Sequence, residues 1–332
     1  MRKKIIGLMM LAAVTVSVVA CGGKGETSTE QSQETAAGSR QEAQETAEKT
    51  EEAENGENMD PVRIATKPMT EQYILGEILK EVIESSTDYT VEVTKGIGGG
   101  TSNIQPAMEK GEFDLYPEYT SSGWVMVLGH SQDKPSDEEM FQQLKQEYEE
   151  KFNMTWLGLY GFNNTYTMVA SKEAADKYGL ENTSDLEAAA GELIFGGNPD
   201  YLEREDGFKM VCDAYGLEFK KVMDIDIGLK YQALTNGDID VTNGYTTDAQ
   251  IGSGAVKALK DDKNVQVNYL CSTVVRQDAL EKYPGLEEAL MKMDGLFSDK
   301  EMAELNYQVE VEGRDEQEVA HQFLVEKGVV EE

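Results

Sequence analysis

Four tyrosines stand at the ends of predicted strands: Tyr119, Tyr166, Tyr245 and Tyr269. In open α/β sheets, ligands bind beside the carboxyl ends of the strands. The face of an aromatic ring attracts cations, and several rings together form a cage for a quaternary ammonium group. The four tyrosines therefore predict a site for a quaternary amine. The alternative for any one of them is a half-buried packing residue, which is the usual role of a tyrosine at a strand end.

Two cations, Lys67 and Arg204, lie in other loops at strand ends and would bind an anionic end of the same ligand. Ser122 and Asn164 are polar residues of the same group of loops. The alternative for each cation is a surface salt bridge, which contributes little to stability. Arg204 lies within the acidic run 203–206, and this position favours the salt bridge for that residue.

The stretch around Tyr119 recurs around Tyr245. Ala107–Ser121 aligns without a gap with Ala233–Thr247, 126 positions later, and Ala, Gly, Asp, Tyr and Thr are identical in the two copies. A chance match of this length is the alternative. A true repeat predicts two α/β lobes of similar build, each of which offers one tyrosine to a shared cleft.

Predicted strands alternate with predicted helices from Val62 onward, which is typical of the α/β class. Thr70 is the expected cap of the first helix, and Ser136 and Ser184 open capping boxes of two later segments. A strand over 266–275 would cross back to the first lobe. Two lobes joined by two crossings, with a ligand cleft between them that closes by a hinge motion, is the simplest architecture.

The N-terminus has the pattern of a secretory lipoprotein. A basic start and an uncharged, mostly apolar run form a signal peptide over 1–20, which ends in a lipobox at Cys21. Lipid attached to Cys21 would anchor the chain on the outer face of the cytoplasmic membrane, whereas an incidental cysteine after an ordinary signal peptide is the alternative. Residues 21–60 have almost no apolar side chains and predict a disordered acidic linker. The formal net charge of −33 argues against nucleic acid as a partner.

Cysteine and histidine chemistry is poorly supported. The chain has three cysteines and two histidines, and the histidines are far apart, so no metal or cofactor is expected. Cys212 shares a helical face with apolar residues, and Cys271 lies on a predicted strand. A disulfide between them is left open, because bridge geometry is strict.

Hydrolysis is the competing interpretation from another class of function. Asp114, Glu118 and Asp240 could form acid–base pairs, but no motif in the sequence activates a nucleophile or holds a metal. Helix caps or solvated loop acids are the expected roles of these three residues.

From Val62 to about Glu312, the chain resembles the lipid-anchored substrate-binding proteins of ABC importers for glycine betaine, choline and carnitine, the osmoprotectant group. The motifs that carry this resemblance are Thr70-Glu-Gln-Tyr-Ile-Leu-Gly-Glu77, Gly98-Gly-Gly-Thr101, Asp114-Leu-Tyr-Pro-Glu-Tyr-Thr120, Gly123-Trp124, Tyr160-Gly-Phe-Asn-Asn-Thr-Tyr166, Tyr201-Leu-Glu-Arg-Glu-Asp-Gly207, Ile227-Gly-Leu229, Tyr245-Thr-Thr-Asp248 and Leu305-Asn-Tyr307. Their order and spacing along the chain are specific.

The resemblance implies a type II periplasmic-binding-protein fold with one lobe over 62–163 plus 270–332 and the other over 164–269. It implies an ammonium cage and a carboxylate-binding group. The cage residues are Tyr119, Tyr166, Tyr245 and Tyr269, and the carboxylate-binding residues are Lys67, Ser122 and Arg204, with Asn164 nearby. Ser122 replaces a common threonine and keeps the hydroxyl. Lys67-Pro-Met departs from the usual pattern after the lysine, and Leu-Cys after Tyr269 departs from the smaller or polar residues that are common there.

The sequence therefore predicts a binding protein and not an enzyme. We expect a monomer that captures a quaternary ammonium osmoprotectant outside the membrane and passes it to ABC permease and ATPase subunits. Glycine betaine is the first expected ligand, with choline, carnitine or proline betaine as alternatives. The competing interpretations are a binding protein for another small amine or amino acid, which would need carboxylates at the amine, and a hydrolase of a choline-type ester.

Overall fold

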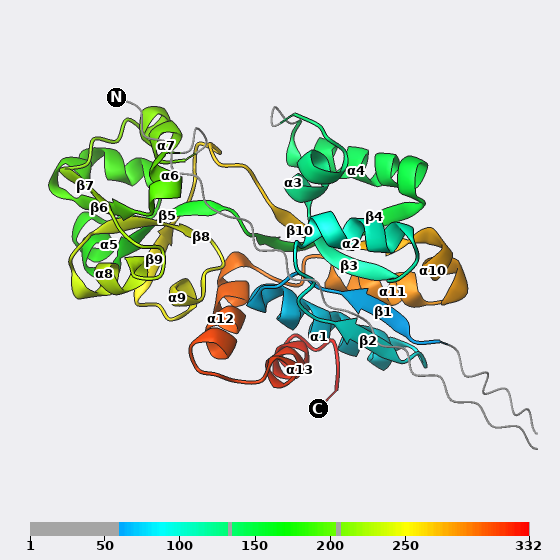
Figure 1. The fold of residues 1–332 in the computed structure, drawn as a ribbon. Helices are drawn as coiled ribbons and strands as arrows, with labels where there is room; N and C mark the ends of the chain where they lie inside the picture. Colours follow the sequence, from blue (N-terminus) through cyan, green and yellow to red (C-terminus); the bar gives the residue numbers. More distant parts are fainter. Residues whose placement is uncertain (1–59, 132–134, 204–206, 332) are drawn as a thin grey trace, which may run out of the picture. The chain divides into compact units, whose positions relative to one another are not determined.

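The computed structural model describes residues 60–131, 135–203 and 207–331, and these form two separate five-stranded sheets. The first sheet has the order β2 (Val91–Thr94), β1 (Val62–Ala65), β3 (Leu115–Tyr119), β10 (Leu270–Arg276) and β4 (Met154–Asn163). The second has the order β7 (Lys221–Asp224), β6 (Ile194–Gly197), β8 (Val241–Tyr245), β5 (Tyr166–Ser171) and β9 (Val256–Leu259). Figure 1 shows both sheets with helices packed around them. The α/β class predicted from the sequence is confirmed.

The two sheets have the same pairing pattern. In the first, β1 is parallel to β2 and β3, and β10 is antiparallel to β3 and β4. In the second, β6 is parallel to β7 and β8, and β5 is antiparallel to β8 and β9. Ile64 of β1 is in register with Leu115 of β3, as Phe195 of β6 is with Val241 of β8. The repeat in the sequence thus corresponds to equivalent helix–strand units in two similar lobes.

Two aspartates at equivalent places of the repeat form hydrogen bonds to the backbone of a neighbouring strand. The Asp114 amide donates to the Arg63 carbonyl (2.8 Å), and its carboxylate accepts from the Arg63 amide (2.8 Å). The Asp240 amide donates to the Ile194 carbonyl (2.9 Å), and its carboxylate accepts from the Ile194 amide (2.8 Å). The expectation that these acids are helix caps or solvated loop acids is therefore wrong: both satisfy backbone groups at the starts of strands.

Helices cover both faces of the first sheet. On one face, α1 (Thr70–Ser86), α11 (Leu286–Leu290), α12 (Asp299–Glu310) and α13 (Glu316–Glu326) enclose a core rich in leucine, isoleucine and valine. On the other face, α2 (Thr101–Glu109) and α4 (Asp137–Phe152) enclose an aromatic core that includes Trp124 and Trp156. The capping box predicted at Ser136 is present, since its hydroxyl accepts from the Glu139 amide at the start of α4.

The second sheet has its own cores on its two faces. Helices α5 (Lys172–Tyr178) and α7 (Phe208–Tyr215) contribute to one, and α8 (Lys230–Asn236) and α9 (Ala249–Gly252) border the other. Each of these mixed sheets thus has a hydrophobic core on both faces, as expected where helices that connect parallel strands cover the sheet.

Two crossings join the sheets, and they lie side by side. One runs from β4 to β5 through Asn164, and the other runs from β9 to β10 through Tyr269. The Asn164 amide donates to the Tyr269 carbonyl (3.2 Å), and the Tyr269 amide donates to the Asn163 side chain (2.7 Å). A third contact connects the lobes where α9 packs on α12. The two helices lie so close that a Cβ atom on Gly252 would be only 2.3 Å from the Ala303 carbonyl oxygen.

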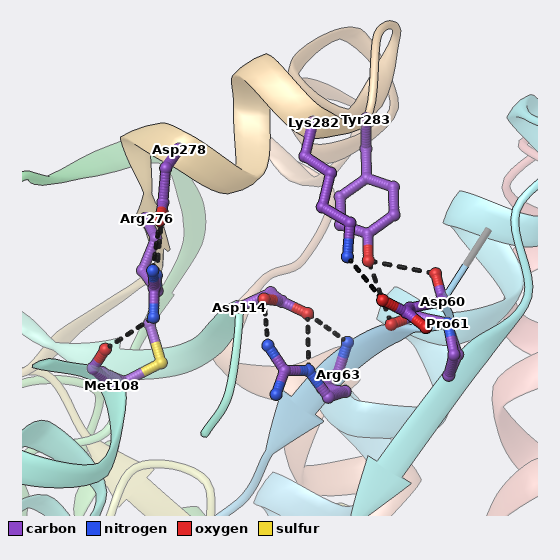
Figure 2. Close-up of polar contacts among 9 residues, drawn as sticks. All are labelled: Asp60, Pro61, Arg63, Met108, Asp114, Arg276, Asp278, Lys282 and Tyr283. Atoms are coloured by element: carbon purple, nitrogen blue, oxygen red, sulfur yellow. Dashed lines mark hydrogen bonds and ion pairs between the residues drawn. The ribbon is translucent and has the colours of Figure 1, made fainter. Parts of the chain in front are cut away.

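Figure 2 shows a polar cluster at the opposite ends of β1 and β3 from Lys67 and Tyr119. Arg63 binds Asp114 through two side-chain nitrogens (2.8 and 3.1 Å). Arg276 pairs with Asp278 and also donates to the Met108 carbonyl (3.2 Å), so it connects the end of β10 to α2. Lys282 and Tyr283 of the following segment bond to Asp60 and Pro61. These bonds hold the first described residues against the first lobe.

Several local expectations differ from the structure. Thr70 is the first residue of α1, and Met69 is the N-cap without a side-chain bond. The box expected at Ser184 instead uses Asn182 and Asp185, two residues earlier, in a 3₁₀ segment. The strand expected over 266–275 begins only at Leu270, because the preceding residues form the crossing.

The disulfide left open by the sequence is absent from the described residues. Cys271 is buried in the core of the first lobe, whereas Cys212 lies on α7 beside the core of the second, and both are free thiols. Burial raises the pKa of both thiols, to about 12 for Cys212, so they stay protonated and unreactive at neutral pH. The expected signal peptide, Cys21 and linker lie outside the described residues. Within the described ranges, no helix combines the length and apolar character needed to cross a bilayer.

Candidate ligand-binding cleft

A cavity of about 490 Å³ lies between the two lobes, bordered by both sheets and both crossings. This volume is within the range typical of small-molecule sites. Seven of the eight residues that the sequence predicts for the ligand lie in its wall: Lys67, Tyr119, Ser122, Asn164, Tyr166, Tyr245 and Tyr269. Arg204, the eighth, lies outside the described residues. The fold thus brings together side chains that are up to two hundred positions apart in the sequence.

Tyr119 forms the wall on the side of the first lobe. It is the last residue of β3, and its hydroxyl donates to the Glu71 carboxylate and accepts from the Gln72 side chain (3.1 Å). Burial raises the pKa of the Tyr119 hydroxyl, and the Glu71 carboxylate beside it adds to this effect. The ring is therefore neutral and held in place from its hydroxyl end.

Lys67 enters the cavity wall as half of a buried ion pair. Its ammonium group binds the Glu118 carboxylate and lies 4.6 Å from the centre of the Tyr119 ring. Glu118 is fully buried and also accepts from the Thr101 hydroxyl (2.7 Å) and the Tyr119 amide (2.6 Å). The expectation of a cap or solvated acid is therefore wrong for Glu118 as well. The ion pair neutralises much of the charge that Lys67 would otherwise offer to an anionic ligand.

Two tyrosines form the wall on the side of the second lobe. Tyr166 begins β5 and Tyr245 ends β8, and the two are direct cross-strand partners. Their rings stack with centroids 4.6 Å apart, and their hydroxyls are hydrogen-bonded at 2.9 Å. An ammonium group does not fit between rings this close. The stacked pair offers one aromatic surface, and a cation would be enclosed between this surface and the rings across the cleft.

Asn164 and Tyr269 place the two crossings in the cavity wall. The Asn164 side chain donates to Glu71 (3.0 Å), and Tyr269 is half-buried against the core of the first lobe. Ser122 ends the short helix α3 (Thr120–Ser122) that directly follows Tyr119. Asn164 and Tyr269 thus belong to the two crossings, whereas Ser122 belongs to the first lobe.

The prediction missed several residues of the cavity wall. They include Glu71, Asn306 and Thr247, which are 4%, 5% and 2% exposed, with Asp248 beside them. Each of the four lies in or beside a motif that carries the family resemblance, but only geometry reveals that these motifs meet. Burial raises the pKa of the Glu71 carboxyl, and hydrogen bonds from Thr247, Tyr119, Asn164 and Asn306 oppose the rise.

Two α/β lobes, two adjacent crossings and a cavity between them define a type II periplasmic-binding protein. A family model described as the substrate-binding domain of the ABC-type glycine betaine transport system matches residues 60–326. The chain belongs to this family.

Relatives of known sequence agree with this assignment. The chain is 43% identical over 269 residues to an ergothioneine transport permease/ergothioneine binding protein of Helicobacter pylori, covering 81% of this chain and 48% of that protein. The chain thus spans about half the length of that relative. It is 37% identical over 271 residues to the carnitine transport binding protein OpuCC of Listeria monocytogenes, covering 81% and 87% of the two chains.

A solved structure shares the fold. The crystal structure of a glycine betaine/carnitine/choline ABC transporter protein superimposes with a TM-score of 0.75 at 31% identity, covering 81% of this chain and 99% of that one.

Proposed function

We propose that this chain is the substrate-binding protein of an ABC importer and that its cavity holds a quaternary ammonium compound. The observation that carries the proposal is that four tyrosines, from both lobes and a crossing, line one cavity. The ammonium group would rest on the stacked Tyr166–Tyr245 surface and be covered by Tyr119 and Tyr269. The family assignment supports the same chemistry, since its model is named for glycine betaine.

The opposite end of the ligand would bind near Lys67, Ser122 and Asn164, with Arg204 as a proposed further contact. Glycine betaine and carnitine, named for the family model and for a relative, are zwitterions with a quaternary ammonium group and a carboxylate. Ergothioneine, named for another relative, has the same two groups and in addition a ring with N–H groups. Glycine betaine is the ligand that the sequence favours, and the wider class is what the cavity supports.

We propose that the chain binds its ligand and does not catalyse a reaction. The relatives are solute-binding proteins. Asp114 and Asp240 bond to backbone groups at the starts of strands, and Glu118 is held by Lys67 and Thr101, so the acids considered for hydrolysis have structural partners. A binding site for an amino acid or another small amine is the second candidate, and the buried Glu71 carboxylate is the observation that favours it.

The proposed arrangement in the cell follows from the family and from the N-terminus. The lobes would comprise 62–163 plus 270–332 and 164–269, and would close on the ligand before docking on permease and ATPase subunits. The protein would act as a monomer outside the cytoplasmic membrane, anchored through lipid on Cys21 after removal of residues 1–20.

Replacing Tyr245 with alanine tests the proposed cage. The loss of the ring should weaken binding of glycine betaine or carnitine by about 1–3 kcal/mol, the scale of a desolvated cation–π contact with its packing. Phenylalanine should cost less because the ring face remains. Isothermal titration calorimetry measures both, with Tyr178→Ala as a control because Tyr178 lies in the second lobe outside the cavity wall. Equal losses for Tyr245→Ala and Tyr178→Ala would refute the cage.

Replacing Cys21 with alanine tests the proposed anchor. The variant should leave the membrane fraction and appear in the soluble fraction, while its ligand affinity in calorimetry stays unchanged because the cavity wall is built from residues beyond position 66. A Cys21→Ala protein that stays with membranes in high salt would contradict lipid anchoring at this residue.

A further inference from the structure

A buried ion pair lies behind Tyr245 in the second lobe. Lys230 is the first residue of α8, and its ammonium group lies 3.7 Å from an oxygen of the Asp248 carboxylate. The ammonium group also donates to the carbonyl of Asn243 in β8 (2.8 Å). The Lys230 side chain is 6% exposed, and burial lowers its pKa while Asp248 opposes this effect. Lys230 is therefore a buried cation that is stabilised by Asp248.

The carboxylate of this pair belongs to the cavity wall. Asp248 lines the cavity, and its side chain is 23% exposed. The oxygen that faces Lys230 also accepts from the Tyr245 amide (3.0 Å) and from the Tyr231 hydroxyl. Lys230 itself lies outside the described cavity wall. The pair thus presents its negative end to the cavity and keeps its positive end behind the wall.

The first lobe has a similar pair with the opposite polarity. There, the Glu118 carboxylate accepts from the Tyr119 amide (2.6 Å) and binds the Lys67 ammonium group. Lys67 lines the cavity, whereas Glu118 is fully buried. In each lobe, the amide of the strand-end tyrosine is thus held by a carboxylate that is paired with a buried lysine. The first lobe offers the cation of its pair to the cavity, and the second lobe offers the anion.

The carboxylate of the second lobe comes from a different place in the repeat. Gly244 occupies the position that Glu118 occupies in the first copy. A Cβ atom on Gly244 would lie 3.1 Å from the Asp248 carboxylate and even closer to the Tyr231 hydroxyl. Asp248 and Tyr231 therefore fill the space that a side chain at position 244 would need. The carboxylate reaches the tyrosine amide from the loop after the strand, and this loop is part of the cavity wall.

Lys230 limits the negative potential that Asp248 creates in the cavity. Asp248 and Tyr245 share one part of the cavity wall, and the ammonium group of the ligand is proposed to rest on the stacked Tyr166–Tyr245 surface. A carboxylate beside that surface attracts a cation. The buried Lys230 ammonium opposes this attraction, and salt screens buried charges only weakly. The ligand therefore experiences the charge of the pair and not of Asp248 alone.

We propose that Lys230 is a specificity-determining residue of the cleft, which sets the preference for a quaternary ammonium group by neutralising Asp248 from behind the cavity wall. The inference rests on the proposed function, since it concerns the ammonium end of the same ligand. A neutral residue in place of Lys230 would leave the Asp248 charge uncompensated, so the cleft should favour cations more strongly. A neutral residue in place of Asp248 would leave the Lys230 charge, so the cleft should favour cations less.

Two ligands of equal shape isolate this effect in calorimetry on the full-length protein. Glycine betaine and its carbon isostere 3,3-dimethylbutanoate differ only in the central atom of the trimethylated head group, so only glycine betaine is cationic there. Lys230→Met should raise the ratio of the two affinities by about threefold to tenfold in favour of glycine betaine, the scale of one uncompensated charge at a partly solvated wall. Asp248→Asn, which keeps an oxygen to accept from Tyr245 and Tyr231, should lower the ratio by a similar factor. The combined variant should return to the wild-type ratio.

Two further variants control for net charge and for packing. Lys257→Met removes a lysine of the same lobe from β9, outside the described cavity wall, so it matches the change in net charge and should leave the ratio unchanged. Lys230→Arg keeps the positive charge and should keep the wild-type ratio. A purely structural role of Lys230 would weaken both ligands alike and would not move the ratio.

The outcomes separate this inference from the proposed function. If Lys230→Met moves the ratio no further than Lys257→Met does, Lys230 does not set the preference, while the binding function stands. Asp248→Asn decides the question by itself if Lys230→Met does not fold, and an unchanged ratio in that variant would refute the inference. If neither glycine betaine, carnitine nor ergothioneine binds to the wild-type protein, the proposed function fails, and this inference fails with it.

Discussion

Replacing Glu118 with alanine is expected to lower the free energy of unfolding by about 3–5 kcal/mol, because the Lys67 ammonium would remain buried without its partner. The side chains of the pair are 8% and 0% exposed, so water cannot replace the lost carboxylate without a rearrangement. The change also removes the acceptor for the Thr101 hydroxyl at the start of α2. Urea denaturation followed by circular dichroism measures the loss.

Two comparisons make this prediction specific to burial. Asp213→Ala breaks the Lys209–Asp213 pair, whose side chains are 66–77% exposed, and should change stability by less than about 1 kcal/mol. Lys67→Met combined with Glu118→Leu removes both charges and should recover most of the loss. If Glu118→Ala is no more damaging than Asp213→Ala, the pair contributes little, and Lys67 is free to serve a ligand.

Replacing Gly161 with alanine is expected to lower the free energy of unfolding by about 2–5 kcal/mol, from backbone strain together with overpacking. Gly161 has φ of 104° within β4, where side chains are rarely tolerated. A Cβ atom there would lie 2.3 Å from the Phe297 carbonyl oxygen, which belongs to the backbone and cannot rotate away. The cost should appear as a lower melting temperature in calorimetry.

Gly179→Ala separates the two causes. Gly179 has φ of 67°, and a Cβ atom there has no neighbour within 4 Å, so this variant carries only the cost of the backbone conformation. We expect about 1 kcal/mol for it. Equal losses at the two glycines would show that β4 shifts to relieve the contact with Phe297.

The elements that the sequence predicts well are those whose signals are local. Alternation of strands and helices identifies the fold class, and the box at Ser136 lies within four residues of sequence. The Ser184 box matches the same pattern, yet Asn182 caps the segment, because a short motif does not specify which of several nearby polar residues is used. The expected strand over 266–275 fails at its first four residues, because their backbone groups bond to side chains and to the other crossing instead of to a sheet.

In the candidate site too, residues with a local sequence signal were predicted, and residues that depend on long-range contacts were not. Aromatic, cationic and polar residues at strand ends could be proposed from their types, and seven of the eight line the cavity. Glu71 and Asn306 could not, because their importance depends on a contact across 235 positions. The sequence also predicts that Lys67 binds the anionic end of a ligand, with a surface salt bridge as the alternative, and its buried pairing with Glu118, 51 positions away, follows only from tertiary structure.

The equivalence of the two sheets has a consequence for how a ligand is oriented. Lys67 and Asn198 occupy equivalent places after β1 and β6, and Glu118 and Gly244 occupy equivalent places before the strand-end tyrosines. One copy of the motif therefore carries an ion pair where the other has an amide and no side chain. The side chains at these equivalent places therefore differ in charge, so the lobes are not interchangeable to a molecule with unlike ends. Such a molecule has one preferred direction in the cleft, because turning it end for end would exchange the surroundings of the Lys67–Glu118 pair for those of Tyr245 and Asp248.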